Sequence, residues 1–267
     1  MPEAKHTLRS PVVTAIYRYP VKGMTPEPLE HAELAPGQTI AYDRAWAIEK
    51  IPGRFDPAAP AHLPKIVFVM LMRDERLATI EARFDEASRM LRLSRGGTVL
   101  GEGCLETERG RTAIEAAIAR ELADGLDSPP RILCARGHSF SDVRDKCLHI
   151  VNLASLRELE RIAGRALSPL RFRPNVLIDG LPAWSERSWV DKRVIIGTVA
   201  FDVFAETVRC PATNVDPATG VRDAGADDVP RLLSGALGHK SFGIYARVAG
   251  PGRIAPGDAV VPPVGTA

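Results

Sequence analysis

Short alternations of apolar and polar residues run through most of the first half of the chain, and a period of two is the pattern of strands with one buried face. It predicts strands over residues 12–19, 39–51, 77–84, 90–93 and 98–100. One stretch has a helical period instead, with apolar residues three and four positions apart at Ile114, Ala117, Ile118 and Leu122. We therefore expect a helix over residues 109–122, with Thr107 as its N-cap.

The second half of the chain shows similar short segments between prolines and glycines. Its apolar segments predict strands over residues 131–135, 148–151, 176–178, 193–204, 243–248 and 259–261. A helix is expected over residues 154–162, with Asn152 as its N-cap. The densest cluster of turn residues, at 124–130, lies between the two halves. The pattern favours a β-rich α+β protein with two domains, residues 1–125 and 126–267.

The composition and charge argue against several functional classes of protein. The 267 residues are 45% hydrophobic, and the net charge of +2 is far from the basic excess of a nucleic-acid-binding protein. The longest uninterrupted apolar run, residues 66–72, is much shorter than the ~20 residues that span a bilayer. The first ten residues lack the apolar stretch of a secretion signal. We expect a cytoplasmic protein with no membrane or nucleic-acid partner.

The cysteines do not form the pairs that hold metal clusters. Cys104, Cys134, Cys147 and Cys210 include no C-x-x-C spacing, which argues against an iron–sulfur centre. Cys134 and Cys147 alternate with two histidines, but without the tight pairing of structural zinc sites. We expect neither zinc nor disulfides, and each thiol needs its own interpretation.

Residues 171–175, with the sequence RFRPN, are the most informative stretch. Pro174 favours an extended Arg173, and strand alternation would then place Arg171, Arg173 and Asn175 on one face. Guanidinium groups bind phosphate oxygens in a planar, bidentate way, so such a row suits a phosphate. The alternative is an exposed strand edge with ordinary ion pairs.

Cys210 lies between Arg209 and Pro211 in a segment rich in turn residues. This setting indicates an accessible thiolate, able to ligate a soft metal or to act as a nucleophile. An incidental buried cysteine is the alternative. Two further cations, Lys22 and Arg44, follow or interrupt expected strands, and each taken alone could be ordinary surface charge.

A family resemblance joins these stretches. Pro20-Val21-Lys22 followed by Asp43-Arg44-x-Trp46 resembles the N-terminal β-barrel domain that precedes MOSC domains. The later motifs resemble the MOSC domain itself, in order: RFRPN at 171–175, Trp189, Ile196-Gly197, Arg209-Cys210, VDPxTG at 215–220, FGxY at 242–245 and GxIxxGD at 252–258. The resemblance implies a small β-barrel-like N-terminal domain packed on a MOSC β-barrel with peripheral helices.

The same resemblance implies a molybdenum cofactor, a pterin dithiolene ending in a phosphate, bound between the domains. By its likeness to the amidoxime-reducing component family, Cys210 would be the metal ligand and the catalytic residue. Gly23 stands where many relatives have serine. The cofactor-binding residues implied, the less secure Arg171 and Thr213 included, are Lys22, Gly23, Arg44, Ser139, Ser141, Asp142, Arg171, Arg173, Asn175, Arg209 and Thr213.

The implied activity is the reduction of N-oxygenated or S-oxygenated small molecules, with electrons from separate flavin or iron–sulfur proteins, because the chain has no sign of its own electron carrier. His239 is a candidate proton donor, or simply a loop histidine. The alternative from another class is a non-catalytic carrier that hands the cofactor, or a sulfur atom on Cys210, to other molybdoenzymes. A third reading is a MOSC-like fold that binds a different small ligand.

Overall fold

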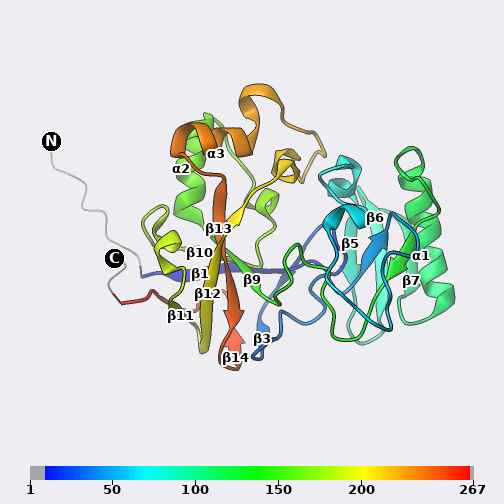
Figure 1. The fold of residues 1–267 in the computed structure, drawn as a ribbon, viewed down its shortest axis with the longest axis horizontal. Coiled ribbons are helices and arrows are strands. Elements are labelled where there is room, and N and C mark those ends of the chain that lie inside the picture. Colours follow the sequence, from blue (N-terminus) through cyan, green and yellow to red (C-terminus); the bar gives the residue numbers. More distant parts are fainter. Residues whose placement is uncertain (1–9, 265–267) are drawn as a thin grey trace.

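The computed structural model describes residues 10–264 and has two lobes (Figure 1). The larger lobe is built around an eight-stranded sheet, and the smaller one around a three-stranded sheet and helix α1 (Glu108–Glu121). This architecture confirms the expected β-rich α+β class, with a curled main sheet and an N-terminal barrel-like part. Within residues 10–264, no helix has the length and apolar character needed to cross a bilayer.

The eight-stranded sheet combines both ends of the sequence. Its order is β15-β11-β12-β13-β9-β10-β1-β2, and the β9–β10 pair is parallel while the other neighbours are antiparallel. In that order the strands are β15 (Val260–Val261), β11 (Arg193–Ile196), β12 (Val199–Val208), β13 (Ser241–Val248), β9 (Leu148–Asn152), β10 (Val176–Asp179), β1 (Val12–Arg18) and β2 (Glu27–Leu29).

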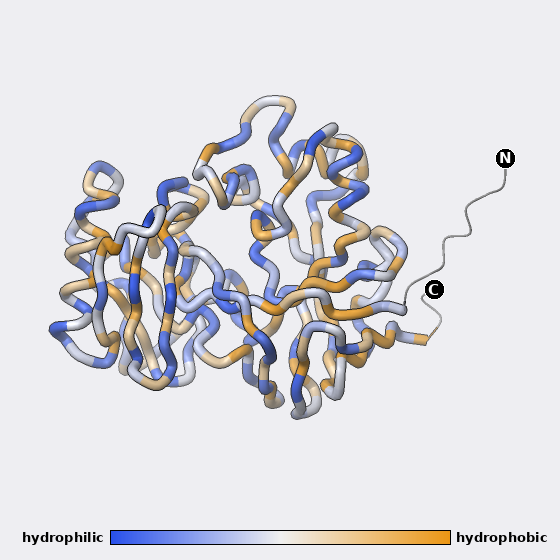
Figure 2. The backbone as a smooth tube through the Cα atoms, turned by 180° about the vertical axis from the view of Figure 1, so that it is seen from behind, coloured by the Kyte–Doolittle hydropathy of each residue, from blue (hydrophilic) through white to orange (hydrophobic). Residues whose placement is uncertain are grey.

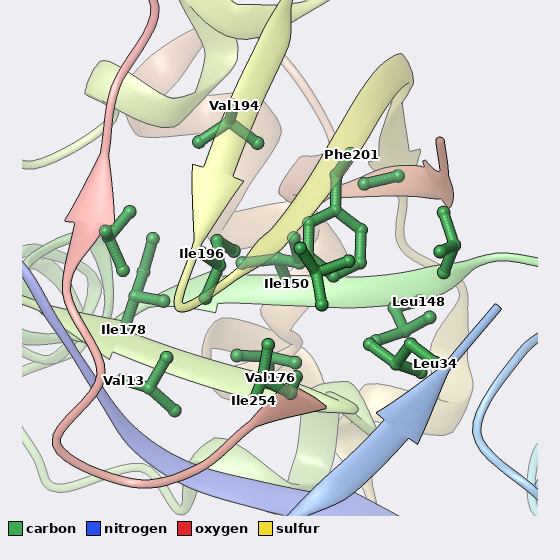
Figure 3. Packing of buried hydrophobic residues seen from close by; sticks show 14 of the residues in the cluster. Val13, Leu34, Leu148, Ile150, Val176, Ile178, Val194, Ile196, Phe201 and Ile254 are labelled. Atoms are coloured by element: carbon green, nitrogen blue, oxygen red, sulfur yellow. The ribbon is translucent and has the colours of Figure 1, made fainter. Parts of the chain in front are cut away.

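The curled sheet encloses a core of aliphatic side chains. Figure 3 shows Ile150, Val176 and Phe201 facing one another from different strands. The short pair β3 (Ala32–Leu34) and β14 (Gly252–Ile254) adds Leu34 and Ile254 to the same cluster and closes its open side. Because these side chains come from segments far apart in the sequence, the lobe needs the first and last strands to complete its core.

Two helices pack on the larger lobe beside this sheet (Figure 1). Helix α2 (Leu153–Ala163) begins as expected after Asn152, whose side chain accepts a hydrogen bond from the Ala154 amide. Helix α3 (Val229–Leu237) was not expected from the sequence; Asp228 caps it and Pro230 occupies its first turn. Both helices share a second apolar cluster around Phe172 and Phe242.

The smaller lobe packs α1 tightly against strand β7. The sheet consists of β5 (Glu81–Phe84), β6 (Met90–Arg95) and β7 (Thr98–Cys104), and β4 (Ala47–Glu49) pairs with β8 (Arg131–Leu133) beside it. Thr107 caps α1 as expected. Gly103 and Gly110 let the two backbones touch, since a Cβ on either would overlap the other segment. Figure 2 shows hydrophobic and hydrophilic residues interleaved along these strands.

Three expected strands differ from the structure. The strand expected over 39–51 is reduced to β4, because Tyr42 and Arg44 adopt left-handed conformations with φ of 62° and 52°. The strand expected over 193–204 is a hairpin, β11 and β12, which turns at Gly197 with φ of 57°. The strand expected over 77–84 begins as a 3-10 helix. This helix is η2 (Glu75–Thr79), and the other 3-10 helices are also short: η1 (Lys65–Val67), η3 (Ala123–Gly125), η4 (Pro169–Phe172), η5 (Ser185–Trp189), η6 (Pro211–Asn214) and η7 (Gly225–Asp227).

The expected domain boundary after residue 125 remains a prediction. The structure adds that β1 and β2, although early in the sequence, pair within the sheet whose other strands come from residues 148–261. The two halves of the chain therefore meet along β1, and the segment that follows β1 reaches the cavity described next.

Candidate functional site

Residues from both halves of the chain line one cavity, which we call the front cavity. The first half contributes the segment after β1, the residue Arg44 and the segment around η1. The second half contributes residues 141–142, the start of β9, the residues that follow β12, the turn after η4, and Tyr245 within β13. The lining residues are Lys22, Gly23, Arg44, Lys65, Met70, Leu71, Met72, Ser141, Asp142, Cys147, His149, Phe172, Arg173, Asn175, Arg209, Cys210, Ala212 and Tyr245.

Backbone conformation directs two of the arginines into the front cavity. Arg44 and Arg173 both have left-handed φ, 52° and 54°, and Arg173 ends the 3-10 helix η4. Because η4 covers residues 169–172 and β10 begins only at Val176, the expected strand alternation of Arg171, Arg173 and Asn175 is wrong. A turn, rather than a strand face, presents Arg173.

Tyr19 supports both guanidinium groups on its ring. The guanidinium carbons of Arg44 and Arg173 lie 4.7 and 4.2 Å from the ring centroid, so both cations rest on the electron-rich face. The ring is fully buried, and this burial raises the pKa of Tyr19 above its ordinary value. A neutral phenol therefore underlies the cations, and its buried hydroxyl has no hydrogen-bond partner among the described residues.

Most guanidinium contacts in the front cavity are to neutral oxygens. Arg173 donates to the Met24 carbonyl at 2.8 Å, and Arg209 donates to the Phe172 carbonyl at 2.9 Å. Asn175 accepts from Arg44 at 3.1 Å through its side-chain oxygen. Burial lowers the pKa of Arg173 to about 10, so it remains charged at neutral pH. The Nε of Arg209 is buried without a partner among the described residues, which leaves a charged donor free.

Two carboxylates pair with cations of the front cavity, and of the two only Asp142 lines it. Asp43 pairs with Arg44 and accepts a hydrogen bond from the Tyr19 amide at 2.9 Å. Asp43 therefore ties Arg44 to the backbone of the residue whose ring supports it. Asp142 pairs with Lys22, whose Nζ also donates to the Phe140 carbonyl at 2.9 Å. Lys22 and nearby cations hold the pKa of Asp142 below its usual range although burial opposes this shift. The cavity thus keeps a surplus of positive charge.

Cys210 faces a lysine that the sequence analysis missed. The thiol is half-buried at the start of η6, where the Cys210 carbonyl accepts from the Thr213 amide and hydroxyl at 3.1 and 2.9 Å. Lys65 Nζ interacts with the Cys210 side chain and lies 3.7 Å from Asp142 Oδ2. Burial opposes the charged form of Lys65, but Asp142 and Cys210 outweigh it and raise its pKa.

His149 is the second lining residue that was missed. Its Nδ1 lies 3.3 Å from the Arg173 carbonyl oxygen, and its Nε2 lies 3.2 Å from the Phe242 carbonyl oxygen. Burial, together with the charge of Arg209, lowers the pKa of His149 to about 3. Gly243 is necessary beside it, since φ is 79° and an added Cβ would lie 2.5 Å from Nε2. A single histidine in an apolar strand has no sequence pattern that would predict these contacts.

The structure brings together most, but not all, of the expected residues. Cys210, Lys22, Gly23, Arg44, Ser141, Asp142, Arg173, Asn175 and Arg209 line the front cavity. Ser139, Arg171 and Thr213 do not. Ser139 donates to the Asp43 carbonyl at 3.0 Å, and Thr213 bonds back to Cys210. His239, the candidate proton donor, is also absent from the lining and lies beside Trp184.

Arg171 has a different environment from the one expected. Its buried guanidinium pairs with Asp216 and Asp223, each at 2.6 Å, and donates to the Asn214 carbonyl at 3.1 Å. The 3-10 conformation of η4 directs this side chain toward the loop that follows Cys210. Arg171 therefore holds the Cys210 segment in place from outside the cavity.

Comparisons with known proteins give one consistent result. Residues 10–121 match the model of the MOSC N-terminal beta barrel domain, and residues 135–261 match that of the MOSC domain. Mitochondrial amidoxime-reducing component 1 of Homo sapiens is 28% identical over 93% of this chain and 82% of that protein. The Mus musculus protein of the same name is 33% identical over 42% of this chain and 35% of that protein. Among solved structures, the YuaD protein of Bacillus subtilis aligns over 94% of both chains with 14% identity and a TM-score of 0.47.

Proposed function

Because the chain belongs to the family in which a MOSC N-terminal beta barrel domain precedes a MOSC domain, we propose that it binds the molybdenum cofactor in the front cavity. The observation that carries this proposal is the convergence of five cations and the Cys210 thiol on a single cavity; the cations are Lys22, Arg44, Lys65, Arg173 and Arg209. The MOSC family is associated with this cofactor. These residues come from segments that lie far apart in the sequence.

The donor set fits the chemistry of the cofactor. A terminal phosphate requires several charged donors, and the guanidinium groups here are bonded largely to neutral oxygens, so their charge remains available. The unpartnered Nε of Arg209 offers another donor. Asp142 does not fit an anion directly; it pairs with Lys22 and would have to share or release that lysine when a phosphate binds.

The roles of the residues follow from their positions. Lys22, Arg44 and Arg173 would hold the phosphate end, with the ring of Tyr19 in contact with both arginines. Cys210 would bind the metal as a thiolate, the form that soft metals prefer. Lys65 interacts with the Cys210 side chain and adds a positive charge beside it. Tyr245 and Phe172 complete the wall and reduce access of water. When bound, the cofactor supplies the two-electron redox chemistry.

We further infer that the protein reduces N-oxygenated or S-oxygenated small molecules. The likeness to proteins named amidoxime-reducing components supports this reaction class. In the N-hydroxylated case, two electrons and two protons break the N–O bond, and the products are the N–H compound and water. The electrons would come from separate flavin or iron–sulfur proteins, and the cytoplasm is the compartment we expect.

A carrier function is the second candidate, and the half-exposed thiol of Cys210 favours it. An accessible thiol can hold a sulfur atom or release a bound metal to an acceptor protein. Under this alternative the chain would bind the cofactor without turning over a substrate, and other molybdoenzymes would be its partners.

The first experiment measures molybdenum and pterin per chain in protein purified anaerobically from a host that makes the cofactor. We expect near-stoichiometric values for the parent and for Cys134→Ser, which removes an exposed thiol outside the front cavity. Cys210→Ser should lose metal, and Arg173→Gln should lose pterin, whereas Arg193→Gln on β11 should lose neither. Absence of both from the parent would overturn the cofactor proposal.

Turnover separates the two candidate functions. With a chemical reductant and an N-hydroxylated amidine, the parent should form the amidine and Cys210→Ser should not. Loaded protein that forms no amidine, but transfers its molybdenum to an apo-molybdoenzyme, would establish the carrier function instead.

A further inference from the structure

A second cavity, which we call the rear cavity, lies on the other side of the segment that carries Arg44. It offers about 540 Å³ of space, enough for a small organic molecule. No residue lines both cavities. The rear cavity is lined by Gln38, Thr39, Ile40, Ala41, Tyr42, Asp43, Ala45, Trp46, Leu105, Glu106, Arg111, Cys134, Ala135, Arg136, Gly137, His138, Ser139 and Lys146.

One wall of the rear cavity contains two aromatic side chains. The rings of Tyr42 and Trp46 are nearly parallel, with an interplanar angle of 4° and centroids 5.9 Å apart. Phe84 packs against both rings from the core. Ile40 and Leu105 add aliphatic surface to the same cavity. This wall suits a ligand with a planar apolar group, which can bury a large contact area against the rings.

Three cations line the rear cavity, and none of them has a carboxylate partner among the described residues. Arg111 donates to the Leu105 carbonyl at 2.9 Å, and Lys146 donates to the Gln38 side-chain oxygen at 2.8 Å. Arg136 is exposed and makes no hydrogen bond or ion pair within residues 10–264. Elsewhere in this chain arginines are commonly paired with acids, as in Arg92–Glu102 and Arg95–Glu121.

The acidic residues at the rear cavity do not cancel this charge. Asp43 is buried and already bound to Arg44 and to the Tyr19 amide. Glu106 is exposed and pairs with Arg89 at 3.2 Å. The cavity therefore presents a positive rim beside an aromatic wall, a combination that is complementary to an organic anion.

We propose that the rear cavity binds a small organic anion with a planar apolar body, its carboxylate held by Arg136 and Lys146 and its body against Tyr42 and Trp46. This site is separate from the cofactor and does not depend on the proposed function. It shares a wall with the front cavity, because Asp43 and Ala45 line one side and Arg44 lines the other. Ser139, in the same wall, donates to the Asp43 carbonyl.

The test is isothermal titration calorimetry of the full-length protein with 2-naphthoate and with the neutral analogue 2-naphthalenemethanol. We expect naphthoate to bind at least about tenfold more tightly, as one charged hydrogen bond provides. Arg136→Gln with Lys146→Gln should remove this preference. Lys192→Gln with Arg193→Gln, which removes two exposed cations from the β11 edge, should retain it. Equal affinity for the two compounds, or no heat with either, would overturn the proposal.

Two more variants show which cavity the anion occupies. Ala41→Trp places a bulky side chain at the exposed edge of the rear cavity and should abolish naphthoate binding without affecting the melting temperature. Arg173→Gln alters only the front cavity and should leave binding unchanged. If Arg173→Gln abolishes binding while Ala41→Trp preserves it, the anion lies in the front cavity and the rear site is wrong.

Discussion

The guanidinium of Arg173 rests 4.2 Å above the ring centroid of Tyr19, a residue that is fully buried at the end of β1. This contact joins the start of the sequence to the turn after η4, and it supports a half-buried arginine at the wall of the front cavity. A half-buried guanidinium needs favourable contacts, and the aromatic face of Tyr19 and the Met24 carbonyl provide them without a carboxylate.

Tyr19→Phe should therefore preserve the site. The substitution keeps the ring and removes a buried hydroxyl that has no partner among the described residues, so the free energy of unfolding should be unchanged or rise by about 1 kcal/mol. Tyr19→Leu removes the ring as well, and the free energy of unfolding should fall by about 2 kcal/mol or more. Urea unfolding checks the two variants side by side. A large loss in Tyr19→Phe would mean that the hydroxyl has an unseen partner, such as a water molecule.

His149 should make stability depend on acid pH. Its pKa is about 3 in the folded protein because burial and Arg209 disfavour the charged ring, whereas an unfolded histidine has an ordinary pKa of about 6.5. Below that value the unfolded state binds a proton that the folded state does not, so stability falls as pH falls from about 6.5 toward 3. This group alone should cost about 2 kcal/mol between pH 7 and pH 5.

Urea unfolding of the parent and of His149→Gln at both pH values isolates that contribution. The variant should be less stable at pH 7 and lose less stability on acidification. His31→Gln, which changes an exposed histidine, should follow the parent. If His149→Gln shows the same loss as the parent, the pKa of His149 does not differ between the folded and unfolded states, which contradicts the prediction.

Gly243→Ala should be among the most damaging single changes in the chain. The residue has φ of 79°, and the added Cβ would lie 2.5 Å from His149 Nε2 and 2.6 Å from the Ile150 carbonyl oxygen. Gly97→Ala is a matched control, because φ is 82° but nothing lies within 4 Å of the new atom. Gly97→Ala should lower the free energy of unfolding by about 1 kcal/mol because of backbone strain alone. Equal melting temperatures for the two variants would contradict the steric argument.

Removing Arg171 should destabilise the loop that carries Cys210. The side chain is 2% exposed and pairs with Asp216 and Asp223. Arg171→Gln leaves Asp216 without its cation and Asp223 with Arg165 alone, and it should cost about 3 kcal/mol. Arg157→Gln breaks an exposed pair with Asp179 and should cost less than about 1 kcal/mol. Faster alkylation of Cys210 in Arg171→Gln would report the loosened loop; an unchanged rate would assign Arg171 to global stability only.

Local sequence patterns predicted much of the fold and several of the residues that line the front cavity. Thr107 and Asn152 cap their helices as expected, because a cap depends on its own next few residues. Lys22, Arg44, Arg173 and Cys210 were found because their motifs occur in a recognisable order. They line one cavity in the structure.

Lys65, His149 and the role of Arg171 depend on tertiary packing. Lys65 interacts with Cys210 from a segment far away in the sequence, and no spacing in the sequence relates the two. The direction of Arg171 was misjudged because the turn at Ser168-Pro169 starts a 3-10 helix, which rotates the side chain away from that of Arg173. Sequence patterns describe neighbours along the chain, whereas these contacts are set by where distant elements meet.

The pairing of β1 with β10 also sets an order of events during synthesis. β1 leaves the ribosome early and can pair with β2 at once, but its other edge stays open until β10 has been translated, well over half the chain later. An open edge is a site for wrong pairing with other chains. The nascent protein therefore depends on slow, long-range closure, and chaperones that shield exposed strands should matter more for its yield than for its final stability.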